Sequence, residues 1–361
     1  MKINVFIKRA KIICHLSNDL ILFSKGHEIY THNLKSNEIL FLNKLPSKIY
    51  LKAISYSKLL SRLLRYGVNI GLQIDENSIL LVFNKKIYNF NILNKSFSES
   101  FKLKRGSRPL NLTKIQGIQG FKDQICFGEY FMNFNKEQVH IYSLNNDDTW
   151  KVSYTFAEGE IEHIHNIIPD KCRNILWILT GDFDNASGIW IAEDNFNKVY
   201  PVVRGRQNYR ACVAFPTKEG LLYGTDSQFE ENSIRLLFNQ NGWKTKKIFD
   251  VNGPIIYGSK HKDDFVFSTS VEGESHKKGK VLQFFDTTIG NGIKSNYAHI
   301  IKGNLDNGFR VIYKNKKDKY PFVLFQFGTL VFPNGENNSD SIFFNVNALK
   351  NHDQSIIKLH I

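Results

Sequence analysis

The sequence contains few cysteines, and none of them form a close pair. Its 361 residues include four, at Cys14, Cys126, Cys172 and Cys212, and no CxxC spacing occurs. Such scattered cysteines exclude the dense disulfide framework of small secreted domains and the paired spacing of zinc fingers. Most of them lie in apolar runs, as buried free thiols do. We therefore expect a protein of the reducing cytoplasm.

Long apolar runs are also missing. No stretch approaches the roughly 18 or more apolar residues that indicate a transmembrane helix. Residues 1–11 are basic, but neither an apolar segment nor a small-residue cleavage site follows them, so we identify no signal peptide. Both absences agree with a cytoplasmic location and with the lack of a transmembrane segment.

Motifs for nucleic-acid binding are absent, although the chain is basic. The formal charge is +14, and residues 1–105 carry 18 Lys and Arg against 6 Asp and Glu. A basic face of this kind attracts nucleic acid, an anionic membrane or an acidic polysaccharide. Because the chain has no recognition helix, zinc-finger spacing or RNP motif, we expect no nucleic-acid partner.

The sequence does contain a series of short apolar runs broken by turn residues. Hydrophobic residues make up 42% and aromatic residues 13% of the chain, which is enough to bury a large core. The runs are rich in Ile, Val, Phe and Tyr and are separated by Asn, Asp, Gly and Lys, as is typical of strands and turns. The predicted strands are 19–23, 28–32, 79–83, 86–90, 124–127, 139–142, 175–179, 188–192, 221–223, 265–268, 281–285, 309–313, 322–327 and 341–346. We predict an all-β fold.

The spacing of these strands indicates a β-propeller. Propeller blades take about 40–50 residues each. The chain therefore accommodates about six to eight blades, and seven is the favoured number. We expect residues 1–361 to form a single propeller domain.

One segment, residues 51–66, has helical spacing instead. Its apolar residues recur on one side, at Tyr56, Leu59, Leu60, Leu63 and Tyr66. The opposite side carries Lys52, Ser55, Lys58, Arg62 and Arg65. We expect a short, basic amphipathic helix whose apolar side packs on its own domain. The alternative is peripheral contact of this helix with an anionic membrane.

Polar residues with reactive side chains gather at the ends of predicted strands between residues 108 and 232. In a propeller, strand ends from different blades line the central channel, so residues distant in sequence converge there. The candidate catalytic residues are Glu129, His163, His165, Asp182, Tyr209 and Arg210. The candidate substrate-binding residues are Arg108, Tyr130, Arg204, Arg206, Gln207, Tyr223, Asp226 and Asn232.

The strongest local signal is the pair His163 and His165. Strand alternation places both imidazoles on one face, and imidazole exchanges protons near neutral pH. We expect no bound cofactor. Two histidines on one face also begin a metal site, with Asp182 or Glu129 as a further ligand, and this is one alternative. The other is that each histidine is a hydrogen-bonded structural residue.

Tyr209 and Arg210 form the second signal. A guanidinium presents donors that fit a carboxylate, such as that of a uronic or sialic acid, and a phenol near that cation can exchange a proton. The alternative is an ion pair of Arg210 with Asp182 or Asp226. Glu129 and Asp182 each follow a glycine directly. They are either the paired carboxylates of a glycosidase or caps of turns.

Several of these phrases together resemble sialidase-like (BNR-repeat) propeller proteins, which are often encoded among bacterial surface-polysaccharide genes. The phrases are 105–110, 127–133, 143–150, 163–165, 177–182, 207–211 and 223–227, and residues 143–150 are similar to the Asp-box turn of that family. The resemblance implies a propeller and a glycan context. It does not extend to sialidase activity, because the set of three arginines and the nucleophilic tyrosine with its glutamate have no clear counterpart here.

A further similarity, to propeller polysaccharide lyases, implies a different chemistry. Those enzymes use a His and Tyr pair with an Arg to remove the proton beside a uronate carboxylate. By this similarity His165 would be the base, Tyr209 the acid, and Arg210 the group that neutralises the carboxylate. We expect a glycoside hydrolase or a polysaccharide lyase acting on an acidic bacterial polysaccharide. The alternative is a non-catalytic propeller that binds a glycan or an assembly partner.

Overall fold

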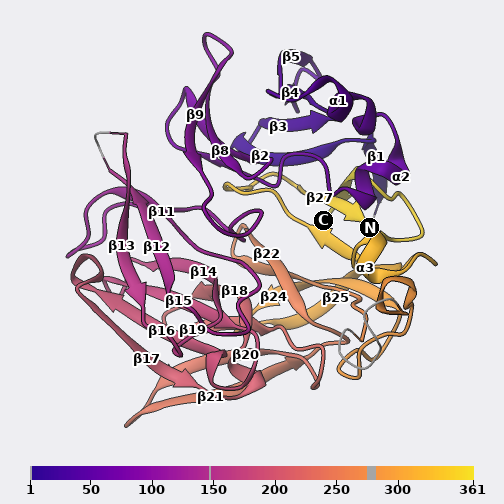
Figure 1. Cartoon of the computed structure of the whole chain (residues 1–361). Coiled ribbons are helices and arrows are strands. Elements are labelled where there is room, and N and C mark those ends of the chain that lie inside the picture. Colours follow the sequence, from indigo (N-terminus) through magenta and orange to yellow (C-terminus); the bar gives the residue numbers. More distant parts are fainter. Residues whose placement is uncertain (1, 146–147, 275–281) are drawn as a thin grey trace.

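The chain folds into seven four-stranded antiparallel sheets around a central axis (Figure 1). The computed structural model describes residues 2–145, 148–274 and 282–361. The sheets are the blades of a seven-bladed β-propeller, so the predicted fold class is confirmed. Within the described residues, no helix is long and apolar enough to cross a membrane.

Each blade is built from four strands that follow one another along the chain, and the first strand lies nearest the axis. Blade 1 consists of β2 (Lys11–Ser17), β3 (Leu20–Lys25), β4 (Glu28–Asn33) and β5 (Ile39–Lys44). Blade 2 consists of β6 (Ile70–Gln73), β7 (Ser78–Phe83), β8 (Lys86–Asn91) and β9 (Ser96–Lys102). Blade 3 consists of β10 (Thr113–Ile115), β11 (Gln124–Gly128), β12 (Val139–Leu144) and β13 (Trp150–Phe156). Blade 4 consists of β14 (His163–Asp170), β15 (Ile175–Gly181), β16 (Gly188–Glu193) and β17 (Lys198–Arg204).

The remaining blades complete the ring. Blade 5 consists of β18 (Ala211–Pro216), β19 (Leu221–Thr225), β20 (Ser233–Asn239) and β21 (Trp243–Asp250). Blade 6 consists of β22 (Ile255–His261), β23 (Asp264–Thr269), β24 (Tyr297–Asn304) and β25 (Gly308–Lys316). Blade 7 consists of β26 (Thr329–Val331), β27 (Ser341–Asn347), β28 (Ser355–His360) and the N-terminal strand β1 (Ile3–Lys8).

Blade 7 joins the two ends of the chain. Strand β1 pairs antiparallel with β28, with Ile3 opposite Leu359 and Lys8 opposite Ser355. The ring is therefore closed by hydrogen bonds between the first and the last strand, and both termini lie at this blade (Figure 1). Closure of this kind ties the two ends of the chain into one blade, while the outermost strand of each sheet keeps one short unpaired edge.

Apolar side chains fill the space between neighbouring blades. All residues of β15 are buried, including Trp177, because both faces of this strand pack against other blades. Glycines permit the closest approach. A Cβ on Gly128 of blade 3 would lie 2.4 Å from Cβ of Ile164 in blade 4, and Gly224 of blade 5 meets Ile255 of blade 6 in the same way.

Alternation of strand direction gives the propeller two different ends. The starts of the first strands and the ends of the second strands lie at one end, which we call the top face. The top face also carries the connections between blades, including residues 45–69 and 317–328. The opposite end, the bottom face, carries the turns between first and second strands and those between third and fourth strands. The two strongest sequence signals, His163 with His165 and Tyr209 with Arg210, therefore lie on the top face. Several of the long loops lie there too.

Two predicted strands are wrong. Residues 322–327 form the short helix α3 (Phe322–Phe325), which begins after Pro321, a residue whose fixed φ suits the start of a helix. Residues 282–285 form the 3₁₀ helix η4 (Leu282–Phe285), and residue 281 lies outside the described residues. Aromatic-rich runs of this length satisfy either period, so tertiary packing decided their conformation.

The predicted amphipathic helix is also corrected. Residues 51–66 contain two helices, α1 (Ile49–Ser55) and α2 (Lys58–Leu63), because Ser57 caps α2 by accepting a hydrogen bond from the backbone N–H of Leu60. The expected orientation is inverted in α2. Arg62 is buried, whereas Leu59 and Leu60 are exposed. The leucines of α2 are therefore turned partly toward solvent, whereas Tyr66 of the predicted apolar side packs against Phe83 as expected.

Candidate active site

The histidine pair lies at the start of β14, on the top face of blade 4. His163 and His165 are both buried, and their ring centroids are 5.0 Å apart with planes tilted by 34°. The predicted common orientation of the two imidazoles is therefore found. Gly181 at the end of β15 makes room for them, since a Cβ there would lie 2.2 Å from Cε1 of His165.

Backbone carbonyl groups fix the protonation of one nitrogen in each ring. Nδ1 of His163 lies 3.1 Å from the carbonyl oxygen of Phe131, and Nδ1 of His165 lies 2.9 Å from that of Ala211. A carbonyl oxygen only accepts hydrogen bonds, so each Nδ1 carries the hydrogen. In the neutral form of either ring, Nε2 then presents a lone pair.

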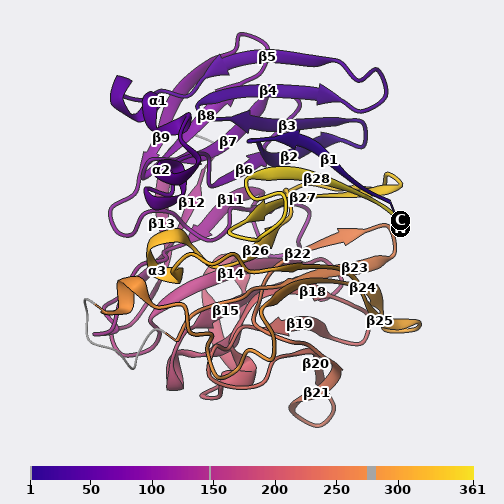
Figure 2. The ribbon, with the colours of Figure 1, turned by 90° about the vertical axis from the view of Figure 1, so that its right-hand side faces the viewer.

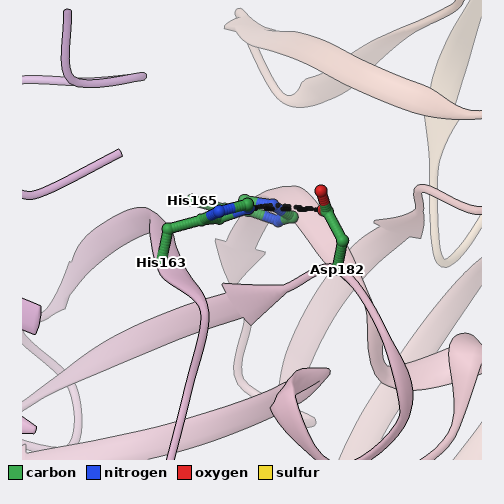
Figure 3. A group of neighbouring side chains, drawn as sticks. All are labelled: His163, His165 and Asp182. Atoms are coloured by element: carbon green, nitrogen blue, oxygen red, sulfur yellow. Dashed lines mark hydrogen bonds and ion pairs between the residues drawn. The ribbon is translucent and has the colours of Figure 1, made fainter. Parts of the chain in front are cut away.

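Asp182, directly after β15, faces both of these lone pairs (Figure 3). Its Oδ1 lies 3.0 Å from Nε2 of His165 and 3.4 Å from Nε2 of His163, and the two Nε2 atoms are 3.1 Å apart. Although burial favours its neutral acid, Arg210 and the two histidines hold the pKa of Asp182 well below its usual range. Three electron-rich atoms therefore converge on one point that requires a proton or a cation.

Arg210 connects this group to a second carboxylate. It precedes β18, and its Nη2 lies 3.0 Å from Oδ1 of Asp182, while its Nε lies 3.4 Å from Oδ2 of Asp226. The predicted alternative for Arg210, an ion pair with these two acids, is what is found. Burial raises the pKa of Asp226, and Cys212 donates to its Oδ2 at 3.2 Å.

Glu272 adds a third buried carboxyl group, from blade 6. Its Oε1 accepts a hydrogen bond of 2.6 Å from Ser270. Burial and the nearby charge of Asp226 raise the pKa of Glu272 to about 8. At neutral pH this group is therefore largely protonated, while Asp182 is ionised.

Tyr130 covers the histidine pair from blade 3. Its ring centroid lies 4.5 Å from that of His163 and 6.0 Å from that of His165, and its side chain is partly exposed. Burial among neighbouring groups and the charge of Asp182 raise the pKa of the phenol, so it stays protonated at neutral pH. Tyr130 is therefore the phenol nearest the histidines.

Two residues predicted to act beside the histidines lie elsewhere. Glu129 points away from the cluster. Its carboxylate pairs with Arg105 and accepts a hydrogen bond of 2.9 Å from the backbone N–H of His140. Tyr209, in the 3₁₀ helix η3 (Gln207–Tyr209), makes no side-chain hydrogen bond among the described residues and lies near Tyr223. Neither contacts the histidine pair.

Other predicted binding residues support loops. Tyr223 is fully buried, and its hydroxyl donates to the carbonyl of Asn208 at 2.8 Å. The buried side-chain amide of Asn232 accepts a hydrogen bond from the backbone N–H of Ser227 and donates one to the carbonyl of the same residue. These contacts are structural, because they satisfy backbone groups inside the protein.

The remaining predicted residues lie around the cluster. Gln207 donates to the carbonyl of Asp182 at 2.9 Å and so holds that turn. Arg204 lies over the Trp190 ring and donates to the carbonyls of Glu160 and Asn185. Arg206 is exposed and has no ion pair among the described residues.

A set of basic side chains lies on the same face, from blades 1 to 3. Lys11 begins β2 and donates from Nζ to the carbonyl of Asn69 at 3.5 Å. Arg65 follows α2, and Arg108 precedes β10. Within the described part of the chain, none of these three forms an ion pair with a carboxylate. Burial and the charge of Arg108 lower the pKa of Lys11 to about 7.

Sequence reasoning did not select Lys11, Arg65, Cys212 or Glu272. Asp182 and Asp226 directly follow the second strands of blades 4 and 5, whereas Glu272 lies three residues after the second strand of blade 6. The end of the second strand was therefore a usable but inexact signal. Lys11 had none, because a lysine at the start of a strand is common and its surroundings come from other blades.

No protein-family model and no curated protein sequence matches this chain. The similarity to sialidase-like proteins thus has no support at the sequence level, and its Asp-box phrase includes residues 146 and 147, which are outside the described residues. Solved structures do match. An oligogalacturonate lyase in complex with manganese is 8% identical with a TM-score of 0.57, covering 98% of this chain and 90% of that one.

Two further structures have a similar architecture. The oligogalacturonate lyase of Vibrio parahaemolyticus is 9% identical with a TM-score of 0.56, covering 99% of this chain and 90% of that one. The AfRom2 CNH domain is 7% identical with a TM-score of 0.55, covering 99% and 97%. At these identities the similarity establishes the propeller fold alone.

Proposed function

We propose that the protein is a polysaccharide lyase that cleaves acidic, uronate-containing oligosaccharides in the top-face channel. The observation that carries this proposal is the convergence of the Nε2 atoms of His163 and His165 on Oδ1 of Asp182. The fold is shared with oligogalacturonate lyases, which act on such sugars, and this supports the choice of substrate.

The three converging atoms fit a divalent cation. Ligand atoms bound to one ion at about 2.0–2.2 Å lie roughly 3.0–3.5 Å apart when their bond angles are near 90–110°. The distances here, 3.1, 3.0 and 3.4 Å, fall in that range. Two imidazoles and one carboxylate on one side of an ion leave its other side open. When bound, a divalent cation at these atoms supplies Lewis-acid polarisation of the substrate carboxylate.

This proposal changes the roles of two predicted residues. Both nitrogens of His165 already face partners, so His165 is a ligand instead of the base. Arg210 is paired with Asp182 and Asp226, so it positions Asp182 and does not bind the sugar. A hydrolase would need Glu129 and Asp182 as its two catalytic carboxylates. Because Glu129 is paired with Arg105, we do not favour this mechanism.

Residues of the channel wall supply the proton transfers. The neutral amine of Lys11 takes the proton from the carbon beside the substrate carboxylate, and its pKa of about 7 suits this task. The bond between the glycosidic oxygen and the sugar then breaks, and a carbon–carbon double bond forms. Tyr130 donates its hydroxyl proton to the leaving oxygen, and both groups recover their protonation states by exchange with water. Arg65 and Arg108 attract the acidic sugar.

An ultraviolet assay for the unsaturated uronate product tests this function. Purified protein with oligogalacturonate and Mn²⁺ is expected to form the product. Lys11→Met and Tyr130→Phe should lose turnover and keep substrate binding. Lys114→Met is the matched control, because Lys114 binds the carbonyl of Ile74 on the bottom face. Absence of product across a panel of uronate glycans and divalent metals would overturn the proposal.

The second candidate is a non-catalytic propeller that binds an acidic glycan. It is favoured by the internal pairing of Arg210, Asp182 and Asp226, which leaves these groups with few free hydrogen-bonding positions. This function predicts glycan binding in calorimetry that produces no unsaturated sugar and is unchanged in Tyr130→Phe.

A further inference from the structure

The helix α2 is anchored to the propeller by its arginine. Arg62 is 5% exposed, and its Nη1 lies 2.6 Å from Asp318 and 3.2 Å from Asp353. Its Nη2 donates to the carbonyl of Phe325, and its guanidinium lies 5.4 Å from the centroid of the Tyr320 ring. A charged side chain thus occupies the position that an apolar residue takes in an ordinary surface helix.

The apolar residues of α1 and α2 are correspondingly turned outward. Ile49 is 84% exposed, Tyr56 69% and Leu64 55%. The exposed set, which we call the apolar hairpin surface, comprises Ile49, Tyr56, Leu59, Leu60, Leu63 and Leu64. Contiguous exposed apolar residues of this kind mark interaction surfaces, because water contact with them is unfavourable.

Polar contacts hold this surface in place. The side-chain amide of Gln354 donates to the carbonyl of Lys58 at 3.1 Å and to the hydroxyl of Ser61 at 3.0 Å. Lys58 also pairs with Asp353 at 3.2 Å. These contacts fix the hairpin on the side that faces the propeller, and Leu59 and Leu64 remain 48% and 55% exposed.

The charge of this region is of one sign. Between Glu38 and Asp75 the sequence has no acidic residue, whereas it contains Lys44, Lys48, Lys52, Lys58, Arg62 and Arg65. Lys44, Lys58 and Arg62 are paired with Glu28, Asp353 and Asp318, respectively. Lys52 in α1 and the exposed Arg65 after α2 form no ion pair among the described residues. Leucines bordered by lysine and arginine are the composition of segments that bind anionic bilayers.

Exposed apolar side chains in loops are concentrated on the same end of the propeller. Top-face loops of other blades contribute Met132, Phe134, Phe229, Phe284 and Phe285. Within residues 2–145, 148–274 and 282–361, the bottom face contributes Leu93 in a loop and Ile361 after the last strand. The helices α1, α2 and α3 lie along one side of the ring in Figure 2. This asymmetry gives the molecule one face suited to an apolar boundary.

We propose that the top face docks on an anionic lipid bilayer through the apolar hairpin surface. The leucines enter the boundary between headgroups and acyl chains, and the neighbouring basic residues contact the anionic headgroups. A bilayer is favoured over a protein partner because the surface is formed by helices of the top face and is bordered by Lys52 and Arg65, two cations that form no ion pair with a carboxylate among the described residues. Docking in this orientation places the mouth of the candidate active site at the membrane surface.

Flotation of the full chain with lipid vesicles tests this proposal. Binding is expected to vesicles of phosphatidylcholine with phosphatidylglycerol, and much less to phosphatidylcholine alone. The variant Leu59→Ser/Leu64→Ser should lose at least tenfold in vesicle affinity. Leu93→Ser, at a residue 73% exposed on the bottom face, is the matched control and should bind as the wild type does. Circular dichroism and the melting temperature verify that all variants are folded.

Three results would overturn the proposal. The first is no binding to either vesicle. The second is equal binding by the double variant and the Leu93→Ser control. The third is self-association in sedimentation velocity without any vesicle binding, if Leu59→Ser/Leu64→Ser abolishes that self-association. This result would identify a second copy of the chain as the occupant of the surface. None of these results depends on catalytic activity, so failure here is distinct from failure of the proposed lyase function.

Discussion

Nε2 of His163 lies 3.1 Å from Nε2 of His165, and both nitrogens face the same oxygen of Asp182. Since both Nδ1 atoms donate to backbone carbonyls, the two neutral rings would direct their lone pairs at one another and at a carboxylate. This arrangement is unfavourable unless a cation or a shared proton occupies the centre. The predictions below follow from that centre and its surroundings.

A divalent cation should stabilise the fold. Ligands that bind only the native state add about 2.7 kcal/mol at a concentration 100 times their Kd. Protein treated with EDTA is expected to gain several degrees in melting temperature when Mn²⁺ is added, and His165→Ala should not. His140→Ala is the control, because His140 bonds Thr155 away from the cluster. An equal gain in His165→Ala would place the ion elsewhere.

Replacing Arg210 should destabilise the protein. Arg210→Met leaves Asp182 and Asp226 buried without their counter-charge, and breaking a buried ion pair costs about 3–5 kcal/mol. Urea unfolding measures the change, and Arg210→Lys should recover part of it. A variant with wild-type stability and weakened glycan binding would show instead that Arg210 contacts the substrate.

Glu272 should make stability fall as pH rises. Its pKa is raised to about 8 in the folded protein, above the value of 4.5 for a free carboxyl group, so the unfolded state releases this proton first. The contribution is complete below about pH 4.5 and is lost progressively up to pH 8, by about 5 kcal/mol at most. Glu272→Gln should remove this slope from urea midpoints measured across that range. A slope unchanged in Glu272→Gln would assign it to other groups.

Lys11 should control the pH dependence of turnover. Only its neutral form accepts a proton, and burial and Arg108 lower its pKa to about 7. The value of kcat/KM is expected to rise through pH 7 and then level off. Arg108→Gln removes one like charge, so the midpoint should move upward. A profile that Arg108→Gln does not shift would separate Lys11 from this titration.

The propeller could be predicted from the sequence because its strands repeat a local pattern. Runs such as 175–179 and 341–346 are apolar and are bounded by turn residues on both sides, and both are strands. The secondary structure of the run 322–327 could not be predicted, because its aromatic residues suit a strand or a helix. In the structure a helix begins directly after Pro321. The orientation of α2 could not be predicted either. It depends on the ion pairs of Arg62 with Asp318 and Asp353, which lie more than two hundred residues away in the sequence.

The residues of the candidate site could be predicted only where they depend on local sequence. The pairing of His163 and His165 was expected from local strand alternation, although the register of β14 against β15 shifts at His165, which the sequence does not reveal. The choice between Tyr130 and Tyr209 depends on which blade faces the histidines, and the sequence does not contain that geometry. Lys11 and Glu272 join the channel only because the ring brings blades 1 and 6 around the same axis.

The most direct test of the central claim is the rate of unsaturated-product formation from oligogalacturonate while Mn²⁺ is titrated into the metal-free protein. The account predicts a rate that rises from background and saturates at one ion per chain, with no rise in His163→Ala. A rate that does not depend on Mn²⁺, or that rises equally in His163→Ala, would contradict it.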